Sequence, residues 1–307
     1  MDSSPLCQYT DLLERIEKID PRRYRSSRNF LDGAVSHLSP FITHGVLNTQ
    51  QIGQILINKF EANTCSKFLS ELAWREFFQR TWQHQGPKIF TDLKKPQAPV
   101  VSLHLPAAFL NANPGIHTID ESIHTLNQDG TIHNHARMWI SGLICNTCQT
   151  HWLEPAQWFY YHLLDGDLAS NSLSWQWIAG TFSHKKYIAN QANINRYSNS
   201  LQTNTPIDLD YPELAELSPP GTWSERSPWQ PAPTILPNST LTEPILPDQR
   251  IALRSIWNLA PSWLAHASDR QILLIEPSHI QAHPLSAKRI QFILHWAKQI
   301  ENLEIFV

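Results

Sequence analysis

One short segment of the chain, HLLDGDLASNSLSWQWIAG, concentrates unusual chemistry. Within thirteen residues it carries the acids Asp165 and Asp167, the amide Asn171 and the indoles Trp175 and Trp177. An ordinary helix-ending turn would leave both acids in water, and that reading fits the DGD triplet taken alone. The combination with an amide and two indoles instead predicts a site for a bound group that is polar on one side and aromatic on the other.

A second stretch, GAVSHLSP, has the composition of an anion-binding turn. Gly33 permits a tight turn, and Ser36 and Ser39 offer hydroxyls beside backbone N–H groups. A turn of this kind that enters a helix suits a diphosphate, because free N–H groups and the helix dipole meet negative charge there. The same residues also make an ordinary helix cap, so the turn by itself is weak evidence.

The cysteines and histidines predict no metal site. Cys145 and Cys148 have metal-binding spacing in CNTC, but no second pair accompanies them, and a structural zinc ion normally needs four ligands. The four cysteines are too few for a disulfide framework in 307 residues. This cysteine usage is typical of a reduced, cytoplasmic protein.

Composition limits the remaining classes of function. No apolar run approaches the ~18 residues that a membrane-spanning helix needs, and the N-terminus lacks the pattern of a secretory signal. A net charge of −3 argues against bulk attraction to a phosphate backbone but allows a local basic groove. A small basic cluster at residues 184–186 is one such local feature. The 12 tryptophans predict dense cores, stacking surfaces or redox chains.

Helices must position most of these side chains. Residues 1–203 place apolar residues three or four apart again and again, which predicts helices at 11–19, 48–60, 67–83, 118–128, 135–152 and 154–166. Four polar residues stand where N-caps are useful, namely Asn48, Ser66, Asp167 and Asn171. The fold class is therefore mainly α.

The chain after residue 203 changes character twice. Residues 204–249 contain ten prolines, which predicts an extended linker or an arm that follows the surface. Residues 250–307 predict a short βαβ segment, with a helix over 250–265, a strand at 271–276, a helix at 286–301 capped by Ser286, and a final strand. Because such a unit leaves sheet edges unpaired, we expect further chain or a partner to continue the sheet.

Four stretches of residues 1–203 together resemble the FAD-binding helical domain of the DNA photolyase and cryptochrome family. They are YRSSRNFLDGAVSHLSPFITHGVL (24–47), ELAWREFF (71–78), GTIHNHARM (130–138) and DGDLASNSLSWQW (165–177). The resemblance implies an all-helical domain that holds FAD, the chromophore, in a central cavity, here without the family's N-terminal antenna domain. It does not by itself imply a particular activity.

The resemblance also implies which residues contact the cofactor. Asp165 is expected to pair with Arg137, since a buried carboxylate needs such a partner, and Asn171 to face the flavin. The implied FAD-binding residues are Tyr24, Val35, Ser36, His37, Leu38, Ser39, Asn134, Arg137, Asp165, Gly166, Asp167 and Asn171. The family usually has Thr and Arg where this chain has Val35 and His37.

A pocket for a pyrimidine dimer is likewise implied. Its residues would be Arg28, Glu71, Trp74, Asn134, Met138 and Trp177, with Glu71 acting on the dimer. Trp175 and Trp152 match the first two members of the family's electron-transfer chain, and the third, surface member falls on Phe109, which is harder to oxidise. Trp158 and Trp139 are candidates to replace it. His135 stands where many members carry an Arg that meets DNA phosphate.

These residues leave three hypotheses open. The first is a deoxyribodipyrimidine photo-lyase-like enzyme, a carbon–carbon lyase in DNA repair, in which light drives an electron from reduced FAD to a dimer in single-stranded DNA. The second is a cryptochrome-like blue-light receptor, and the third an FAD-binding protein without repair activity. The expected partner is damaged DNA, not a membrane, and the C-terminal segment is expected to contact a protein partner or a separate antenna subunit.

Overall fold

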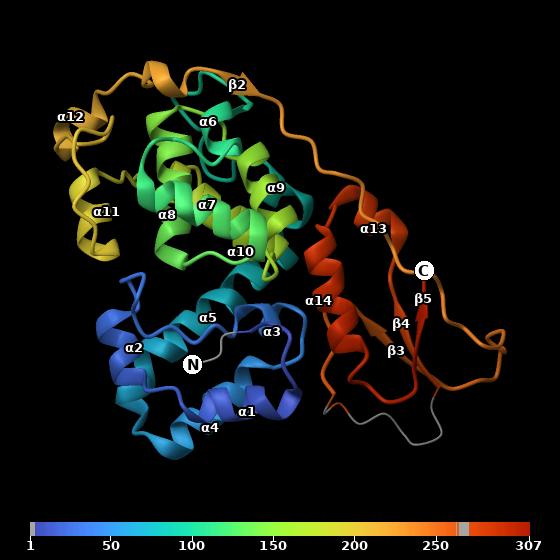
Figure 1. Cartoon of the computed structure of the whole chain (residues 1–307). Coiled ribbons are helices and arrows are strands. Elements are labelled where there is room, and N and C mark those ends of the chain that lie inside the picture. Colours follow the sequence, from blue (N-terminus) through green and yellow to red (C-terminus); the bar gives the residue numbers. More distant parts are fainter. Residues whose placement is uncertain (1–3, 262, 264–269) are drawn as a thin grey trace.

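The computed structural model describes residues 4–261, 263 and 270–307, and the part before residue 204 is mostly helical (Figure 1). In chain order its helices are α1 (Tyr9–Glu17), α2 (Pro21–Ser27), α3 (Ser39–Thr43), α4 (Thr49–Lys59), α5 (Ala62–Gln85), α6 (Ala107–Leu110), α7 (His117–Asp129), α8 (Asn134–Gly142), α9 (Leu153–His162), α10 (Leu168–Ala179) and α11 (Gln191–Ser198). The predicted helical fold class is confirmed. Within the described ranges, no helix has the length and apolarity needed to cross a membrane.

Local capping chemistry fixes where some of these helices begin. The side chains of Asn48 and Asp167 each accept a hydrogen bond from a backbone N–H in the first turn, so both predicted N-caps are confirmed. Ser66 and Asn171 are not caps, because both lie inside helices. The helix around Ser66 already begins at Ala62, where no side chain caps it, so packing and not a cap sets that boundary.

The helix predicted over 135–152 is divided. α8 ends at Gly142, and residues Leu143–Thr147 continue as a π-helical segment. The thiols of Cys145 and Cys148 lie buried in and just after this segment. In the described part of the chain no cluster of three or more His, Cys, Asp or Glu has the arrangement of a metal site.

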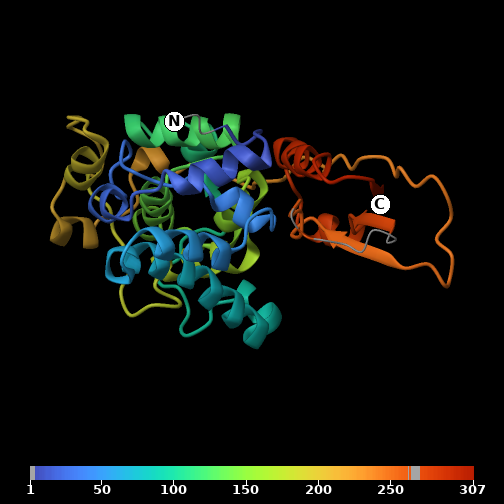
Figure 2. The ribbon, with the colours of Figure 1, turned by 90° about the horizontal axis from the view of Figure 1, so that it is seen from below.

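The proline-rich stretch runs along the helices as an arm and then crosses to the C-terminal unit (Figures 1 and 2). It contains the short helix α12 (Tyr211–Ala215) and the strand β2 (Arg226–Ser227), which pairs antiparallel with β1 (Leu105–Pro106). Trp223 is buried beside it and donates its indole N–H to the Pro114 carbonyl at 2.9 Å. The arm is therefore anchored to the helices by side-chain burial as well as by strand pairing.

The C-terminal unit is a three-stranded parallel sheet with helices. Its strands β3 (Ile251–Ser255), β4 (Arg270–Leu274) and β5 (Leu303–Phe306) lie in the order β3-β4-β5. Between β4 and β5 the chain forms α13 (Pro277–Ala282) and α14 (Ala287–Ala297), and Ser286 caps α14 as predicted. The helix predicted over 250–265 is wrong at its start, because residues there pair with β4 and form a strand.

The arm also covers one edge of this sheet. Thr240 N–H donates to the Ile305 carbonyl at 2.8 Å, and Val307 N–H donates to the Ser239 hydroxyl at 3.0 Å. These bonds satisfy backbone groups of β5 that an open edge would leave to a neighbouring chain. At this edge the chain's own arm, and not a further strand, supplies the partner that we expected from elsewhere.

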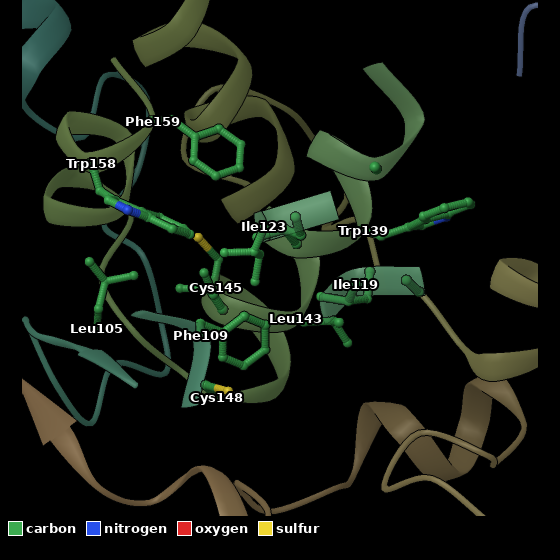
Figure 3. Packing of buried hydrophobic residues seen from close by; sticks show 14 of the residues in the cluster. Leu105, Phe109, Ile119, Ile123, Trp139, Leu143, Cys145, Cys148, Trp158 and Phe159 are labelled. Atoms are coloured by element: carbon green, nitrogen blue, oxygen red, sulfur yellow. The ribbon is translucent and has the colours of Figure 1, made fainter. Parts of the chain in front are cut away.

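Two hydrophobic cores hold the molecule together. One lies within the later helices, where Phe109, Ile119, Trp139 and their neighbours pack tightly (Figure 3). The other joins the first helices to α14, and in it Phe41 contacts Phe292 and Trp296 at ring-centroid distances of 5.7 and 5.4 Å. Full burial of one such side chain stabilises by about 1.5–3 kcal/mol, so the C-terminal unit is firmly attached to the helical part.

His44 makes this second core sensitive to acid. Its Nδ1 lies 2.7 Å from the Ile256 carbonyl and its Nε2 lies 3.4 Å from Arg289 Nε. Burial, together with the Arg289 charge, lowers the His44 pKa to about 3, although the Ile256 and Leu164 carbonyls oppose the shift. The ring therefore stays neutral in the folded protein at pH values where it is protonated in the unfolded chain.

We expect the free energy of unfolding to fall as the pH drops below about 6.5, because only the unfolded chain then binds a proton at His44. The loss is about 1.4 kcal/mol per pH unit from this group, and His133 and His162, whose pKa values burial lowers to about 4, act in the same direction. Urea unfolding at pH 7.0 and 5.5 measures it. The variant His44→Gln should show a shallower pH dependence and exposed His117→Gln an unchanged one; equal slopes in all three proteins would contradict the assignment.

Candidate functional site

A cavity of about 600 Å³ lies between α2, α5, α8, α9 and α10. Of the residues that the sequence singled out, those that line it are Tyr24, Arg28, Ser36, Ser39, Glu71, Trp74, Asn134, Arg137, Met138, Asp165, Gly166, Asp167, Asn171, Trp175 and Trp177. Segments far apart in the sequence thus meet around one space. Val35, His37, Leu38 and Trp152 do not line it.

An ion pair forms the charged side of the cavity. Arg137 Nη2 lies 3.0 and 2.9 Å from the two carboxylate oxygens of Asp165, which confirms the predicted pairing. Burial alone would raise the pKa of Asp165, but the Arg137 charge, a hydrogen bond from Ser39 and the Arg75 charge together hold it below its usual value. Asp165 is therefore ionised. Arg137 lines the cavity and has further N–H groups that can bind a ligand there.

The loop that carries the two acids is held from behind. Asp167 caps α10 through Ser170 N–H and accepts a 2.5 Å hydrogen bond from Gln79 of α5. Gly166, between the acids, accepts a hydrogen bond from the Arg289 guanidinium of α14. A Cβ on Gly166 would lie 2.6 Å from Arg289 Nη1, so only glycine allows this approach. The C-terminal unit therefore supports the cavity wall directly.

The serine-rich turn presents part of what the sequence predicted. Ser36 and Ser39 reach the cavity, and α3 begins at Ser39 with no side chain capping its first turn. Leu38 is buried away from the cavity, and His37 has a left-handed φ of 52°. The turn therefore offers the Ser36 hydroxyl and uncapped backbone N–H groups, while the Ser39 hydroxyl is engaged with Asp165 and the side chains of Val35, His37 and Leu38 face elsewhere.

The polar amides and the inner indole lie on α8 and α10. Asn171 donates to the Ala156 carbonyl at 2.8 Å, which fixes its amide so that the oxygen remains available. Trp175, three per cent exposed, lines the cavity and contacts the edge of Phe159 at a centroid distance of 5.0 Å. Asn134 begins α8, one turn before Arg137. Asn134 and Arg137 are three residues apart, and Asn171 and Trp175 are four apart, so helical spacing alone brings each pair to one face of its helix.

The outer part of the cavity combines one acid, two cations and two indoles. Glu71 lies 2.6 Å from Lys67 Nζ and 3.4 Å from Arg28 Nη2. Trp74 and Trp177 are 49% and 45% exposed, which is unusual for indoles and leaves their faces free to stack. The Glu71 carboxylate is therefore held at the cavity mouth by its ion pairs with Lys67 and Arg28. Met138 lies on the same lining.

The predicted electron-transfer chain is changed at its outer end. Trp152 is fully buried, and its indole N–H donates to Asp92 at 2.7 Å. Phe109 is not at the surface as expected, because it is fully buried among the core side chains (Figure 3). It also packs edge-on against Trp223 at a centroid distance of 5.3 Å. A run of aromatic contacts leaves Trp175 in another direction, through Phe159 to Trp158 at 5.1 Å.

His135, which stands where many family members carry an Arg that meets DNA phosphate, is buried in this structure. It is 8% exposed, its Nδ1–H donates to the Asn29 carbonyl at 2.7 Å, and its ring contacts those of Trp139 and Tyr197 at centroid distances of 4.5 and 4.7 Å. Burial lowers its pKa. A neutral, buried ring of this kind is part of the core and offers no charge to a phosphate.

Several residues in or beside the cavity wall escaped the sequence reasoning. Lys67 stands four residues before Glu71, a helical ion-pair spacing that is visible in the sequence. Arg75 reaches the Thr43 hydroxyl at 2.9 Å, and Thr43 in turn donates to the Asp165 carbonyl. Phe78 and Phe182 also line the cavity. The contacts of Arg75 and Phe182 depend on packing between distant segments, so no local pattern signals them.

Comparison with known families gives one match that covers half of the chain. A family model described as the FAD binding domain of DNA photolyase matches residues 68–224. Among curated proteins, a deoxyribodipyrimidine photo-lyase of Streptomyces griseus is 28% identical over 206 residues, covering 63% of this chain and 43% of that protein. The photo-lyase of Escherichia coli is 29% identical over 171 residues, covering 52% and 35%. The chain spans less than half the length of these relatives.

Solved structures share the fold at low identity. The cryptochrome of Synechocystis superposes with a TM-score of 0.52 at 22% identity, covering 62% of this chain and 43% of that one. An archaeal photolyase of Sulfolobus tokodaii, described with two FAD molecules, superposes with a TM-score of 0.55 at 20% identity, covering 71% and 54%. The helical architecture around the cavity is therefore that of photolyases and cryptochromes.

Proposed function

Since this chain belongs to the family of FAD-binding domains of DNA photolyases, we propose that it uses blue light to reverse pyrimidine dimers, with single-stranded DNA as the preferred substrate. One observation carries the proposal. The acid, the two exposed indoles and the amide of the predicted dimer pocket, Glu71, Trp74, Trp177 and Asn134, open into the same cavity as the Arg137–Asp165 pair. Substrate and cofactor would therefore share one space.

The donor set of the cavity fits FAD, the cofactor of this family. Ser36 and the uncapped first turn of α3 suit a diphosphate. Arg137 offers charged N–H groups, and the Asn171 oxygen offers an acceptor for a ring N–H. A volume of about 600 Å³ lies within the ~300–1,000 Å³ usual for ligand sites.

When bound and reduced, FAD supplies a light-driven electron to the dimer, whose two cyclobutane C–C bonds break before the electron returns. The residues of this chain bind and orient. Trp74 and Trp177 would stack on the extruded bases and offset the loss of stacking within the strand. Glu71, held by Lys67 and Arg28, would hydrogen-bond the dimer. The positive charges of Lys67 and Arg28 would stabilise the negative charge that the dimer gains with the electron.

The preference for single strands follows from what surrounds the cavity. Duplex binding depends on Lys and Arg neutralising phosphates, yet His135 is turned into the core and the net charge is −3. A single strand needs no unpairing before a dimer enters the cavity, so the energetic cost of extrusion is smaller. Base–aromatic stacking then supplies most of the affinity.

We expect purified protein with reduced FAD to reverse dimers in irradiated oligothymidine under blue light. Trp177→Ala should lower affinity for damaged strands by about 5- to 150-fold, since one base–aromatic contact is worth ~1–3 kcal/mol, and should leave FAD in place. Glu71→Gln should lower the yield of repair per absorbed photon more than it lowers binding. Chromatography of the oligonucleotide after illumination measures repair, and fluorescence anisotropy with labelled irradiated oligothymidine in the dark measures binding.

The exposed indole Trp257 of the C-terminal unit, 40% exposed and outside the cavity, gives a matched control. Trp257→Ala should repair dimers as the parent protein does. If the parent reverses no dimer with fully reduced FAD, the enzymatic proposal fails. Equal discrimination of damaged strands by the parent and Trp177→Ala would remove Trp177 from the pocket.

A blue-light receptor is the second candidate, and one contact favours it. Arg289 of the C-terminal unit donates a hydrogen bond to the Gly166 carbonyl in the cavity wall. Through this bond a structural change at the flavin would reach the C-terminal unit, where a protein partner would bind. Light-dependent protection of α14 from hydrogen exchange, in protein that repairs no dimer, would support this function instead of repair.

A further inference from the structure

Aromatic side chains form a continuous exposed surface beyond the cavity mouth. Phe77 of α5, 46% exposed, does not line the cavity. It contacts Trp74 at a ring-centroid distance of 5.4 Å, Phe78 at 5.8 Å and Phe182 at 6.4 Å. The aromatic surface that begins at Trp74 therefore extends through Phe77 to Phe182, which also lines the cavity.

The position of these rings on α5 is unusual. Trp74, Phe77 and Phe78 stand at helical spacing and so share one face of the helix. Such a face normally packs into a core, but here Trp74 and Phe77 remain about half exposed. An aromatic face left open beside a binding cavity is typical of a surface that a ligand covers.

Four lysines border the same surface. Lys94 Nζ lies 4.9 Å from the centre of the Phe182 ring, and the Lys94 backbone N–H bonds the Thr181 carbonyl. Lys95, Lys185 and Lys186 lie exposed on the same two loops. Within the described residues, none of the four has a carboxylate at ion-pair distance.

The acids near this surface are already engaged. Glu76 pairs with Arg80 at 2.7 Å on the same helix. Asp92 accepts the Trp152 indole N–H and the Gln97 backbone N–H. The lysines therefore leave a net positive border around the exposed rings of Trp74 and Phe77 and the partly exposed ring of Phe182, which matches the charge and the bases of a nucleic acid strand.

We propose that Phe77 and Phe182, with Lys94 and Lys185, form a stacking track that holds the single-stranded DNA next to the dimer. This inference rests on the proposed function for the identity of the strand. Phe77 and Phe182 stack on undamaged flanking bases, and the lysines neutralise phosphates between them. Because every base has a flat face, the track is indifferent to sequence.

The test is binding of undamaged, fluorescently labelled oligothymidine in the dark, which requires no photochemistry. Phe77→Ala and Phe182→Ala should each weaken binding about tenfold by fluorescence anisotropy, whereas Phe182→Tyr should retain it. Lys94→Ala combined with Lys185→Ala should reduce the slope of log affinity against log salt by about 1.4, since each phosphate contact on a single strand contributes ~0.7.

Matched controls are Tyr211→Ala, an aromatic 48% exposed on α12, and Lys298→Ala, an exposed lysine of the C-terminal unit. Both should bind as the parent does. Flavin absorbance and thermal unfolding establish that each variant is folded. Parent-like binding by folded Phe77→Ala and Phe182→Ala overturns the track even if dimers are repaired. Weakened binding by both variants supports it even if the parent repairs no dimer, so the two proposals fail separately.

Discussion

Asp165→Ala is expected to lose bound FAD on purification, and Arg137→Gln to do the same. Removing one partner of a buried ion pair leaves an uncompensated charge, at a cost of about 3–5 kcal/mol. Asp165 is 7% exposed at its side chain while Arg137 is 27% exposed, so Asp165→Ala leaves a cation that water partly solvates, whereas Arg137→Gln leaves a buried carboxylate and should be the more severe variant. Flavin absorbance per polypeptide and titration of the apoprotein with FAD measure the effect.

A second ion pair in the same chain provides the control. Arg270 and Glu304 of the C-terminal sheet lie 2.7 Å apart and are 11% and 18% exposed, which resembles the geometry of the Asp165 pair at a site remote from the cavity. Glu304→Ala should keep its full complement of FAD. Equal FAD content in Asp165→Ala and in Glu304→Ala would show that the Asp165 assignment is wrong.

Arg289→Met is expected to be the most damaging change in the C-terminal unit. The Arg289 guanidinium is fully buried, donates to the carbonyls of Tyr160 and Gly166 and stacks over the Tyr160 ring. Each carbonyl left without its donor costs about 1–3 kcal/mol, so the free energy of unfolding should fall by about 2–6 kcal/mol. FAD affinity should fall as well, because the Gly166 loop carries Asp165 and Asp167, two of the acids that line the cavity.

Arg254→Met separates the two effects. Arg254 is also fully buried in the C-terminal unit and bonds Gln271 and the Ala260 carbonyl, but it does not reach the cavity. Urea unfolding of the apoproteins should show comparable destabilisation in both variants. FAD titration, at a temperature where both are folded, should show weaker binding only in Arg289→Met. Parent-like FAD affinity in that variant would mean that α14 supports the fold and not the site.

Local pattern was enough for much of the site. Asn134 and Arg137, like Asp167 and Asn171, are three or four residues apart, so helix geometry alone places each pair on one face. The cap at Asp167 needs only its own side chain and the next turn of backbone. The resemblance in four short stretches then named the residues that surround a common cavity, and the Asp165–Arg137 pair formed as expected.

Contacts between distant segments lay outside such reasoning. Phe109 looked like a surface position, yet the arm brings Trp223 against it and buries it. The chain at 251–255 has apolar residues compatible with a helix, and pairing with β4 makes it a strand. His135 turns inward because Trp139 and Tyr197 offer it a stacking site. In each case tertiary packing supplies the contact, and the hydrophobic periodicity of the sequence does not predict it.

The sequence by itself therefore determined the mainly helical fold class, the family and most of the residues of the cavity, because short-range spacing sets helix faces and caps. Tertiary structure alone decided that α14 supports the cavity through Arg289, and that Phe77 and Phe182 meet at its mouth. Arg289 and Gly166 are separated by 123 residues along the chain. Their contact exists only because the burial of Phe292 and Trp296 against Phe41 offsets the conformational entropy lost when the C-terminal unit packs onto the first helices.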